Sequence, residues 1–118
     1  MQSLSLTIGR GQVGTDRLLS SEQWEAFVSE TQSLVRSFGF DIVVSNFGTG
    51  EWDGASEQNY IALGIREVPC GQIELEDLRQ SVELLAKQYE QDAIALGLGD
   101  SQLVTAVGSP VEVTSDAA

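Results

Sequence analysis

The chain has 118 residues, 42% of them hydrophobic, which is enough for one domain with its own core and too few for two. It contains no histidine and one cysteine, Cys70, which excludes an intramolecular disulfide, a cysteine-based zinc site and a Ser-His-Asp or Cys-His nucleophile. No apolar run approaches the roughly 20 residues of a membrane span, and the N-terminal sequence lacks the features of a signal peptide, so we expect a cytoplasmic protein.

Six basic and eighteen acidic residues give a net charge of −12. This charge repels nucleic acid and anionic membranes, so the sequence predicts no direct binding to either. A solvated surface is the ordinary interpretation of such a charge. The alternatives are mimicry of a phosphate backbone and docking on a basic protein groove.

The first predicted strand covers residues 3–8, where Leu4, Leu6 and Ile8 alternate with hydroxyl side chains. Residues 10–19 are predicted as a loop because they show no period and contain two glycines. The G-x-G-x-x-G pattern from Gly9 onward invites a dinucleotide-binding interpretation. Its context argues against this, because the next helix begins six or seven residues after the last glycine.

A first helix is predicted from Ser20 or Ser21, since Ser20 and Gln23 have the spacing of a capping box, and Gly39 ends it. Apolar residues at spacings of three and four define its buried face. That face consists of Trp24, Phe27, Val28, Thr31, Leu34, Val35 and Phe38.

Two further strands are predicted at residues 40–45 and 59–65, joined by a glycine-rich hairpin tip at residues 46–56. The side chains predicted to face inward are Phe40, Ile42 and Val44 on the second strand and Ile61, Leu63 and Ile65 on the third. Cys70 follows in a loop, where we predict an inert thiol because no histidine is present to lower its pKa.

The second helix has the clearest pattern in the chain, and a strand with a period of two follows it at residues 94–98. Residues 103–107 are a candidate fifth strand. We predict one α+β domain at residues 1–108 and a flexible tail at residues 109–118. The apolar stripe of the helix consists of Leu75, Leu78, Val82, Leu85 and Tyr89.

The order β-α-β-β-α-β predicts a ferredoxin-like sandwich, in which an antiparallel sheet carries both helices on one face. The other face is predicted to carry mostly small, uncharged side chains, and we expect a second subunit's sheet, giving a homodimer, or the C-terminal segment to cover it. The predicted residues are Ser3, Ser5, Thr7, Val43, Ser45, Tyr60, Ala62, Gly64, Ala93, Ala95 and Gly97.

Three connections should meet at one end of this sheet, and convergent loops often carry function. Trp52 either caps the core or anchors a partner. Carboxylates there could bind Mg²⁺ or Ca²⁺, but their spacing is not that of an EF-hand and arginines can neutralise them, so we predict no metal and no cofactor. The candidate interaction residues are Glu51, Trp52, Asp53, Glu57, Asp16, Arg17 and Asp92, with Arg10 and Gln91 nearby.

Three short motifs resemble a family of short, uncharacterised bacterial and phage proteins on a βαββαβ frame. The motifs are Trp-x-x-Phe at Trp24 and Phe27, Gly-x-Trp at Gly50 and Trp52 followed by Glu57, and Tyr-x-Gln at Tyr89 and Gln91. The resemblance covers roughly residues 4–98. It implies the βαββαβ fold and a bacterial or phage source, and it transfers no catalytic residue.

The charge, the lack of histidine and the Trp52 tip favour a non-catalytic interaction protein, such as a phage or mobile-element inhibitor of a basic, nucleic-acid-handling protein. The alternative is a small cofactor-free enzyme or ligand-binding protein of the dimeric ferredoxin-like type. Its pocket would lie between sheet and helices, with Asn46, Trp52, Asn59 or Tyr60 as polar groups. A third hypothesis is a domain that serves assembly through its uncharged sheet face.

Overall fold

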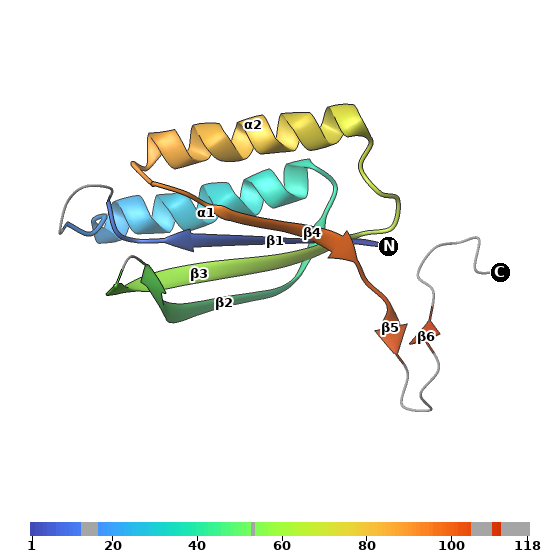
Figure 1. Ribbon diagram of the computed structural model, residues 1–118, viewed down its shortest axis with the longest axis horizontal. Coiled ribbons are helices and arrows are strands. Elements are labelled where there is room, and N and C mark those ends of the chain that lie inside the picture. Colours follow the sequence, from blue (N-terminus) through green and yellow to red (C-terminus); the bar gives the residue numbers. More distant parts are fainter. Residues whose placement is uncertain (13–16, 53, 105–109, 112–118) are drawn as a thin grey trace.

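The computed structural model describes residues 1–12, 17–52, 54–104 and 110–111. Four strands form one antiparallel sheet in the order β2-β3-β1-β4, and both helices lie on one face of it (Figure 1). The predicted ferredoxin-like α+β fold is therefore confirmed. The elements are β1 (Gln2–Gly9), α1 (Ser21–Ser37), β2 (Asp41–Trp52), β3 (Ala55–Arg66), α2 (Gln72–Gln88) and β4 (Ala95–Asp100).

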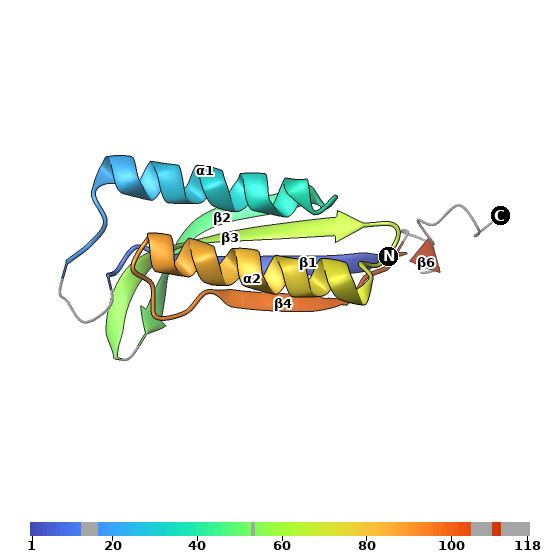
Figure 2. The same ribbon diagram turned by 90° about the horizontal axis from the view of Figure 1, so that it is seen from above.

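Seen from above, α1 lies on the side of β2 and β3, and α2 lies over β1 and β4 (Figure 2). Neither helix of the described part of the chain has the length and apolar character needed to cross a membrane. Two short strands, β5 (Leu103–Val104) and β6 (Pro110–Val111), pair with each other outside the main sheet. β6 lies within the predicted tail, and the division of the chain at residue 108 stays a prediction.

The ends of α1 match the capping pattern in the sequence. The backbone N–H of Gln23 donates to Oγ of Ser20 at 3.1 Å, and the N–H of Ser20 donates to Oε1 of Gln23 at 2.9 Å. Gly39 follows the helix with φ +82, a left-handed conformation that glycine adopts without strain. These local interactions fix where α1 begins and ends.

The core lies between the two helices and the sheet, and it contains the predicted apolar stripes. Leu6 of β1, Phe27 of α1 and Leu78 of α2 are completely buried. The rings of Phe27 and Tyr89 stack with centroids 4.4 Å apart and planes 9° from parallel, which joins the two helices. At the opposite end of the helices, Arg66 donates to the carbonyl of Phe38 and forms an ion pair with Glu74.

The predicted orientation of β3 is wrong. Tyr60 and Ala62 face the helices and are buried, whereas Ile61 is 41% exposed on the other face. At Gly64 the helix-facing side has no room for a side chain, because Val35 of α1 and Phe40 pack closely there. A Cβ added at Gly64 would lie 2.9 Å from Cβ of Phe40. Because both faces of this strand are apolar, its alternation does not reveal which one is buried.

The prediction for β2 fails at the third of its three inward positions. Phe40 is buried and Ile42 is partly buried, but Val44 is 56% exposed because the register with β3 shifts between Ile42 and Val44. Such a bulge places two residues of one strand opposite one of its partner, so the following side chains change faces. Val44 therefore pairs with Leu63 on the open face of the sheet, and Phe47 pairs with Tyr60 on the helix side.

The hairpin also differs from the expected long tip. Residues 46–52 and 55–56, predicted as loop, are paired strand, so only residues 53 and 54 separate β2 from β3. Gly54 has φ +79, which suits a tight hairpin turn.

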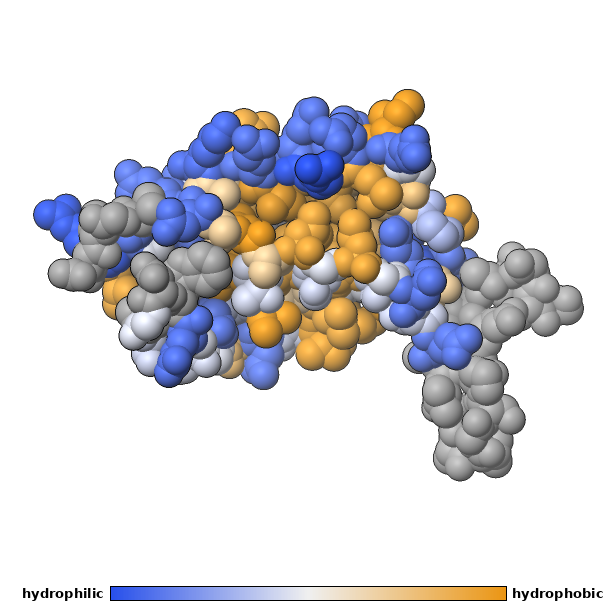
Figure 3. Space-filling view, in the orientation of Figure 1, coloured by the Kyte–Doolittle hydropathy of each residue, from blue (hydrophilic) through white to orange (hydrophobic). Residues whose placement is uncertain are grey.

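In the orientation of Figure 1, polar side chains cover α2 while apolar ones gather along the side of the sheet beneath it (Figure 3).

Candidate functional site

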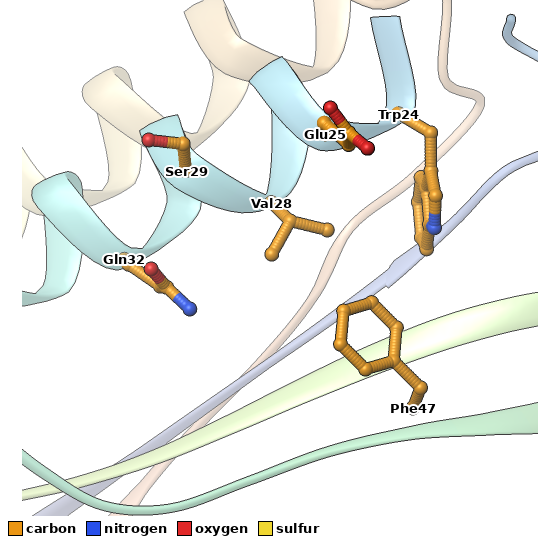
Figure 4. Close-up of a pocket in the computed structure, with 6 residues that line it drawn as sticks. All are labelled: Trp24, Glu25, Val28, Ser29, Gln32 and Phe47. Atoms are coloured by element: carbon orange, nitrogen blue, oxygen red, sulfur yellow. The ribbon is translucent and has the colours of Figure 1, made fainter. Parts of the chain in front are cut away.

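A cleft with a volume of about 210 Å³ opens between α1 and β2 (Figure 4). Helical spacing positions one of its walls, since residues four apart lie above one another on a helix. The walls are formed by one row on α1 (Trp24, Val28 and Gln32), a neighbouring row (Glu25 and Ser29), and Phe47 of β2.

Phe47 lies across the cleft from Trp24 and is 60% exposed. Its ring centroid is 6.4 Å from that of Trp24, with an interplanar angle of 66°, and 5.0 Å from that of Tyr60. Both neighbouring rings are buried, so Phe47 packs against two fixed aromatic side chains. An exposed aromatic ring beside a hollow is the kind of apolar surface that small-molecule sites use.

The polar groups of the cleft come from α1. Nε2 of Gln32 donates a hydrogen bond to Oη of Tyr60 at 2.9 Å, which holds the amide against the sheet. In the described part of the chain, the carbonyl oxygen of Gln32 accepts no hydrogen bond. Glu25 and Ser29 are exposed at the rim. The site thus offers aromatic surface, an oriented amide and a carboxylate.

Those sequence-predicted residues that the structure describes lie elsewhere, at the end of the sheet where three connections meet. Oε2 of Glu57 accepts a hydrogen bond from the N–H of Gly11 at 2.9 Å, and Nε2 of Gln91 donates to the carbonyl of Gly11 at 2.9 Å. The side chain of Glu57 also fills the space that a Cβ at Gly9 would need. The first two glycines of the G-x-G-x-x-G pattern, Gly9 and Gly11, therefore admit a glutamate side chain.

Arg10 also belongs to this end of the sheet. Arg10 donates from Nη1 to Oε1 of Gln58 and from Nε to the carbonyl of Leu19. Arg17, Glu51 and Asp92 are exposed. Asp16, Asp53 and the side chain of Trp52 lie outside the described residues, and the functional role of this end stays a prediction. Within the described ranges, no three His, Cys, Asp or Glu side chains form a metal-binding group.

Four polar residues were predicted to line a ligand pocket. One of them, Tyr60, is linked to the cleft because its hydroxyl accepts a hydrogen bond from Gln32, which lines the cleft. Asn46 pairs with Ile61, and Asn59 is the next residue on that face, so both lie on the opposite side of the sheet. Phe47 was missed because its glycine-rich surroundings indicated a loop. The polar residues interleaved with the apolar stripe of α1, Glu25, Ser29 and Gln32, were the only signal in the sequence for this site.

Cys70 is buried, and its Sγ lies 2.7 Å from Nη1 of Arg66. Its backbone N–H donates to Oε1 of Gln2. The thiol therefore belongs to the packing between the N-terminal end of α2 and the sheet, away from the cleft.

No protein-family model matches the sequence, and neither does any curated protein. Among solved structures, a phage SAM lyase in complex with S-methyl-5′-thioadenosine is similar, with a TM-score of 0.56 and 17% identity over 84% of this chain and 80% of that chain. A phage SAM lyase in the apo state gives a TM-score of 0.56 and 14% identity over 83% of this chain and 78% of that chain. At these identities the likeness shows the fold.

These neighbours are enzymes, which contradicts the prediction of a non-catalytic interaction protein. That prediction weighed net charge and the missing histidine, and neither excludes an enzyme that uses carboxylates or only binding and orientation. The alternative hypothesis, a small enzyme or ligand-binding protein on the ferredoxin-like fold, agrees better with the neighbours.

Proposed function

We propose that this protein is a small enzyme that acts on S-adenosylmethionine or a related sulfonium nucleoside, with the aromatic cleft as its substrate site. The observation that carries the proposal is the likeness to the phage SAM lyases, which extends over more than four fifths of this chain.

The cleft has the chemistry that a nucleoside base requires. A planar purine can stack on the exposed ring of Phe47, and base–aromatic stacking contributes about 1–3 kcal/mol. The amide of Gln32 can donate to and accept from the polar edge of such a base. The volume of about 210 Å³ is below the roughly 300–1,000 Å³ of whole small-molecule sites, so the cleft suits the ring while the rest of the ligand extends across the rim.

The charge of the site fits the other part of the ligand. A sulfonium carries a positive charge, which is attracted both to a carboxylate such as that of Glu25 and to the face of an aromatic ring. The net charge of −12 raises the local concentration of cations near the protein surface. A cationic nucleoside is therefore a better match than a nucleotide, whose phosphates the protein would repel.

The lyase chemistry makes modest demands on the side chains. S-methyl-5′-thioadenosine is S-adenosylmethionine without its aminobutyryl chain, so the carbon–sulfur bond to that chain breaks and its electron pair neutralises the sulfonium. As that bond breaks, the chain's own carboxylate attacks the same carbon to form a lactone, or a base removes a proton from the neighbouring carbon to leave an alkene, and no water is added. Since the protein has no histidine, Glu25 is the proposed group at the cleft for stabilising the cation or accepting the proton.

Calorimetric titration of S-methyl-5′-thioadenosine and S-adenosylmethionine into the protein tests this assignment. Phe47→Ala should weaken both ligands about tenfold, because it removes the stacking surface. Glu25→Gln should weaken the cationic ligand selectively, since S-methyl-5′-thioadenosine is neutral.

Two matched variants control for indirect effects. Val68→Ala truncates another apolar side chain that is 67% exposed, and Glu22→Gln neutralises another exposed carboxylate of α1. Both should bind as the unmodified protein does. Failure of both nucleosides to bind, or equal effects of Phe47→Ala and Val68→Ala, would remove the cleft from the proposal. A cytoplasmic location and a phage origin remain predictions.

A further inference from the structure

The face of the sheet opposite the helices is not covered by any part of the described chain. The pairing of β2 with β3 places Val44, Leu63, Ile61 and Ile65 together on it. Val44 is 56% and Ile61 is 41% exposed, and Leu63 and Ile65 are partly exposed. We call these four residues and the neighbouring β1 and β4 side chains the open sheet face.

The rest of the open sheet face is small and close to flat. Ser3, Ser5 and Thr7 of β1 lie beside Gly99, Gly97 and Ala95 of β4. A side chain at Gly97 would collide with Oγ of Ser5, since a Cβ there would be 2.6 Å from it. The side chains of β1 and β4 on this half of the face are therefore small or absent, which leaves a shelf beside the aliphatic ridge of β2 and β3.

Charge is largely absent from the open sheet face. Among the described strand positions between Ile61 and Ile65, pairing adds one carboxylate, Asp41, at the corner opposite Ile65. A second carboxylate on this side of the sheet, Glu57, lies beyond Asn59 and accepts a hydrogen bond from the N–H of Gly11. A basic protein would find little negative charge here, and a nucleic acid would find no positive charge.

We infer that the open sheet face is an interface with a second copy of this chain, face to face. Two molecules of charge −12 repel each other over most of their surfaces, so the apolar centre of this face, between Asp41 and Glu57, is where they can approach closely. The ridge of one copy can lie on the small-residue shelf of the other, because a two-fold arrangement brings the same patch of each copy together.

The area is sufficient for a specific but moderate interface. Four strands about 4.8 Å apart with roughly seven residues each, at about 3.3 Å per residue, span about 450 Å² in projection. Two such faces with their surface relief reach about 1,000 Å² of buried surface, which is the lower range of specific interfaces. Association should therefore depend on concentration in the micromolar range.

Sedimentation velocity over a dilution series tests the interface. The unmodified chain should sediment as one species of two-chain mass at high concentration and as single chains on dilution. Ile61→Lys, and separately Val44→Lys, should abolish the two-chain species, because each would bury an ammonium group at the contact. Leu84→Lys is the matched control, since Leu84 is 66% exposed on α2 and its replacement should leave association unchanged.

Circular dichroism of each variant identifies any loss of folding. A chain that stays monomeric at all concentrations would overturn the inference, as would an assembly that survives both Ile61→Lys and Val44→Lys in folded protein. Because the cleft lies on the other side of the sheet, binding of S-methyl-5′-thioadenosine by Ile61→Lys reports separately on the proposed function.

Discussion

Gln32 donates a hydrogen bond from Nε2 to Oη of Tyr60 at 2.9 Å, and this bond joins α1 to β3 at the aromatic cleft. Tyr60 in turn supports Phe47, whose ring centroid is 5.0 Å away. The amide and the exposed ring that form the proposed ligand site are thus both positioned by one buried tyrosine. A comparison of substitutions at Gln32 and at Tyr60 should separate the contribution of this hydrogen bond to stability from the contribution of the Gln32 amide to ligand binding.

Gln32→Leu and Tyr60→Phe each remove this hydrogen bond, so each should lower the free energy of unfolding by about 0.5–1.5 kcal/mol. Only Gln32→Leu also removes the amide from the cleft, and it should weaken binding of S-methyl-5′-thioadenosine about tenfold further than Tyr60→Phe does. Urea titration and calorimetry measure the two quantities. Equal binding by the two variants would mean that Gln32 does not contact the ligand.

Gly64→Ala should destabilise the fold by about 1–3 kcal/mol, the range for overpacking a close contact. The added Cβ would lie 2.9 Å from Cβ of Phe40 and 3.1 Å from Cγ1 of Val35, where α1 ends against the sheet. Gly99→Ala is the control, because a Cβ there would meet only Oγ of Ser3, at 3.7 Å. In thermal unfolding, Gly99→Ala should unfold close to the temperature of the unmodified protein and Gly64→Ala well below it. Equal losses of stability in the two variants would contradict the close packing at Gly64.

Burial raises the pKa of the Tyr89 phenol to about 12 from its usual 10, with a further contribution from its hydrogen bond to Glu30. A raised pKa in the folded state means that the protonated phenol stabilises the fold fully below pH 10 and that this stability is lost as pH rises from 10 toward 12. Tyr89→Phe keeps the ring that stacks on Phe27 and removes the ionisable group.

The difference in unfolding free energy between the unmodified chain and Tyr89→Phe should therefore be constant at neutral pH and shrink above pH 10. Urea unfolding across this range measures it, and ultraviolet absorbance of tyrosinate follows the ionisation directly. A difference that stays constant up to pH 12, or a Tyr89 that titrates near pH 10, would show that the phenol is not held in a protonated, desolvated position.

The helices could be predicted closely from sequence because their signals are local. Ser20 and Gln23 mark one end of α1, Gly39 marks the other, and the stripe from Leu75 to Tyr89 marks the buried face of α2. The order of elements was then enough to give the topology. These features depend on neighbours within one or two turns, which a single sequence contains in full.

The faces of the central strands could not be predicted because both are apolar and their assignment depends on tertiary contacts. Gly64 faces α1 because Phe40 and Val35 pack against it, and the bulge before Val44 moves Phe47 to the helix side. The hairpin was predictable in part, since Asp53-Gly54 is a strong turn signal that the surrounding glycines obscured. The cleft depends on all of these, so the sequence alone did not reveal it.

The most direct test of the proposed function is incubation of the purified protein with S-adenosylmethionine, followed by chromatography and mass detection of S-methyl-5′-thioadenosine against a protein-free control. We expect release of S-methyl-5′-thioadenosine by the unmodified chain and by Val68→Ala, and a loss of at least tenfold in rate for Phe47→Ala. The proposed function would be contradicted if S-methyl-5′-thioadenosine formed no faster than in the protein-free control, or if Phe47→Ala and Val68→Ala formed it at equal rates.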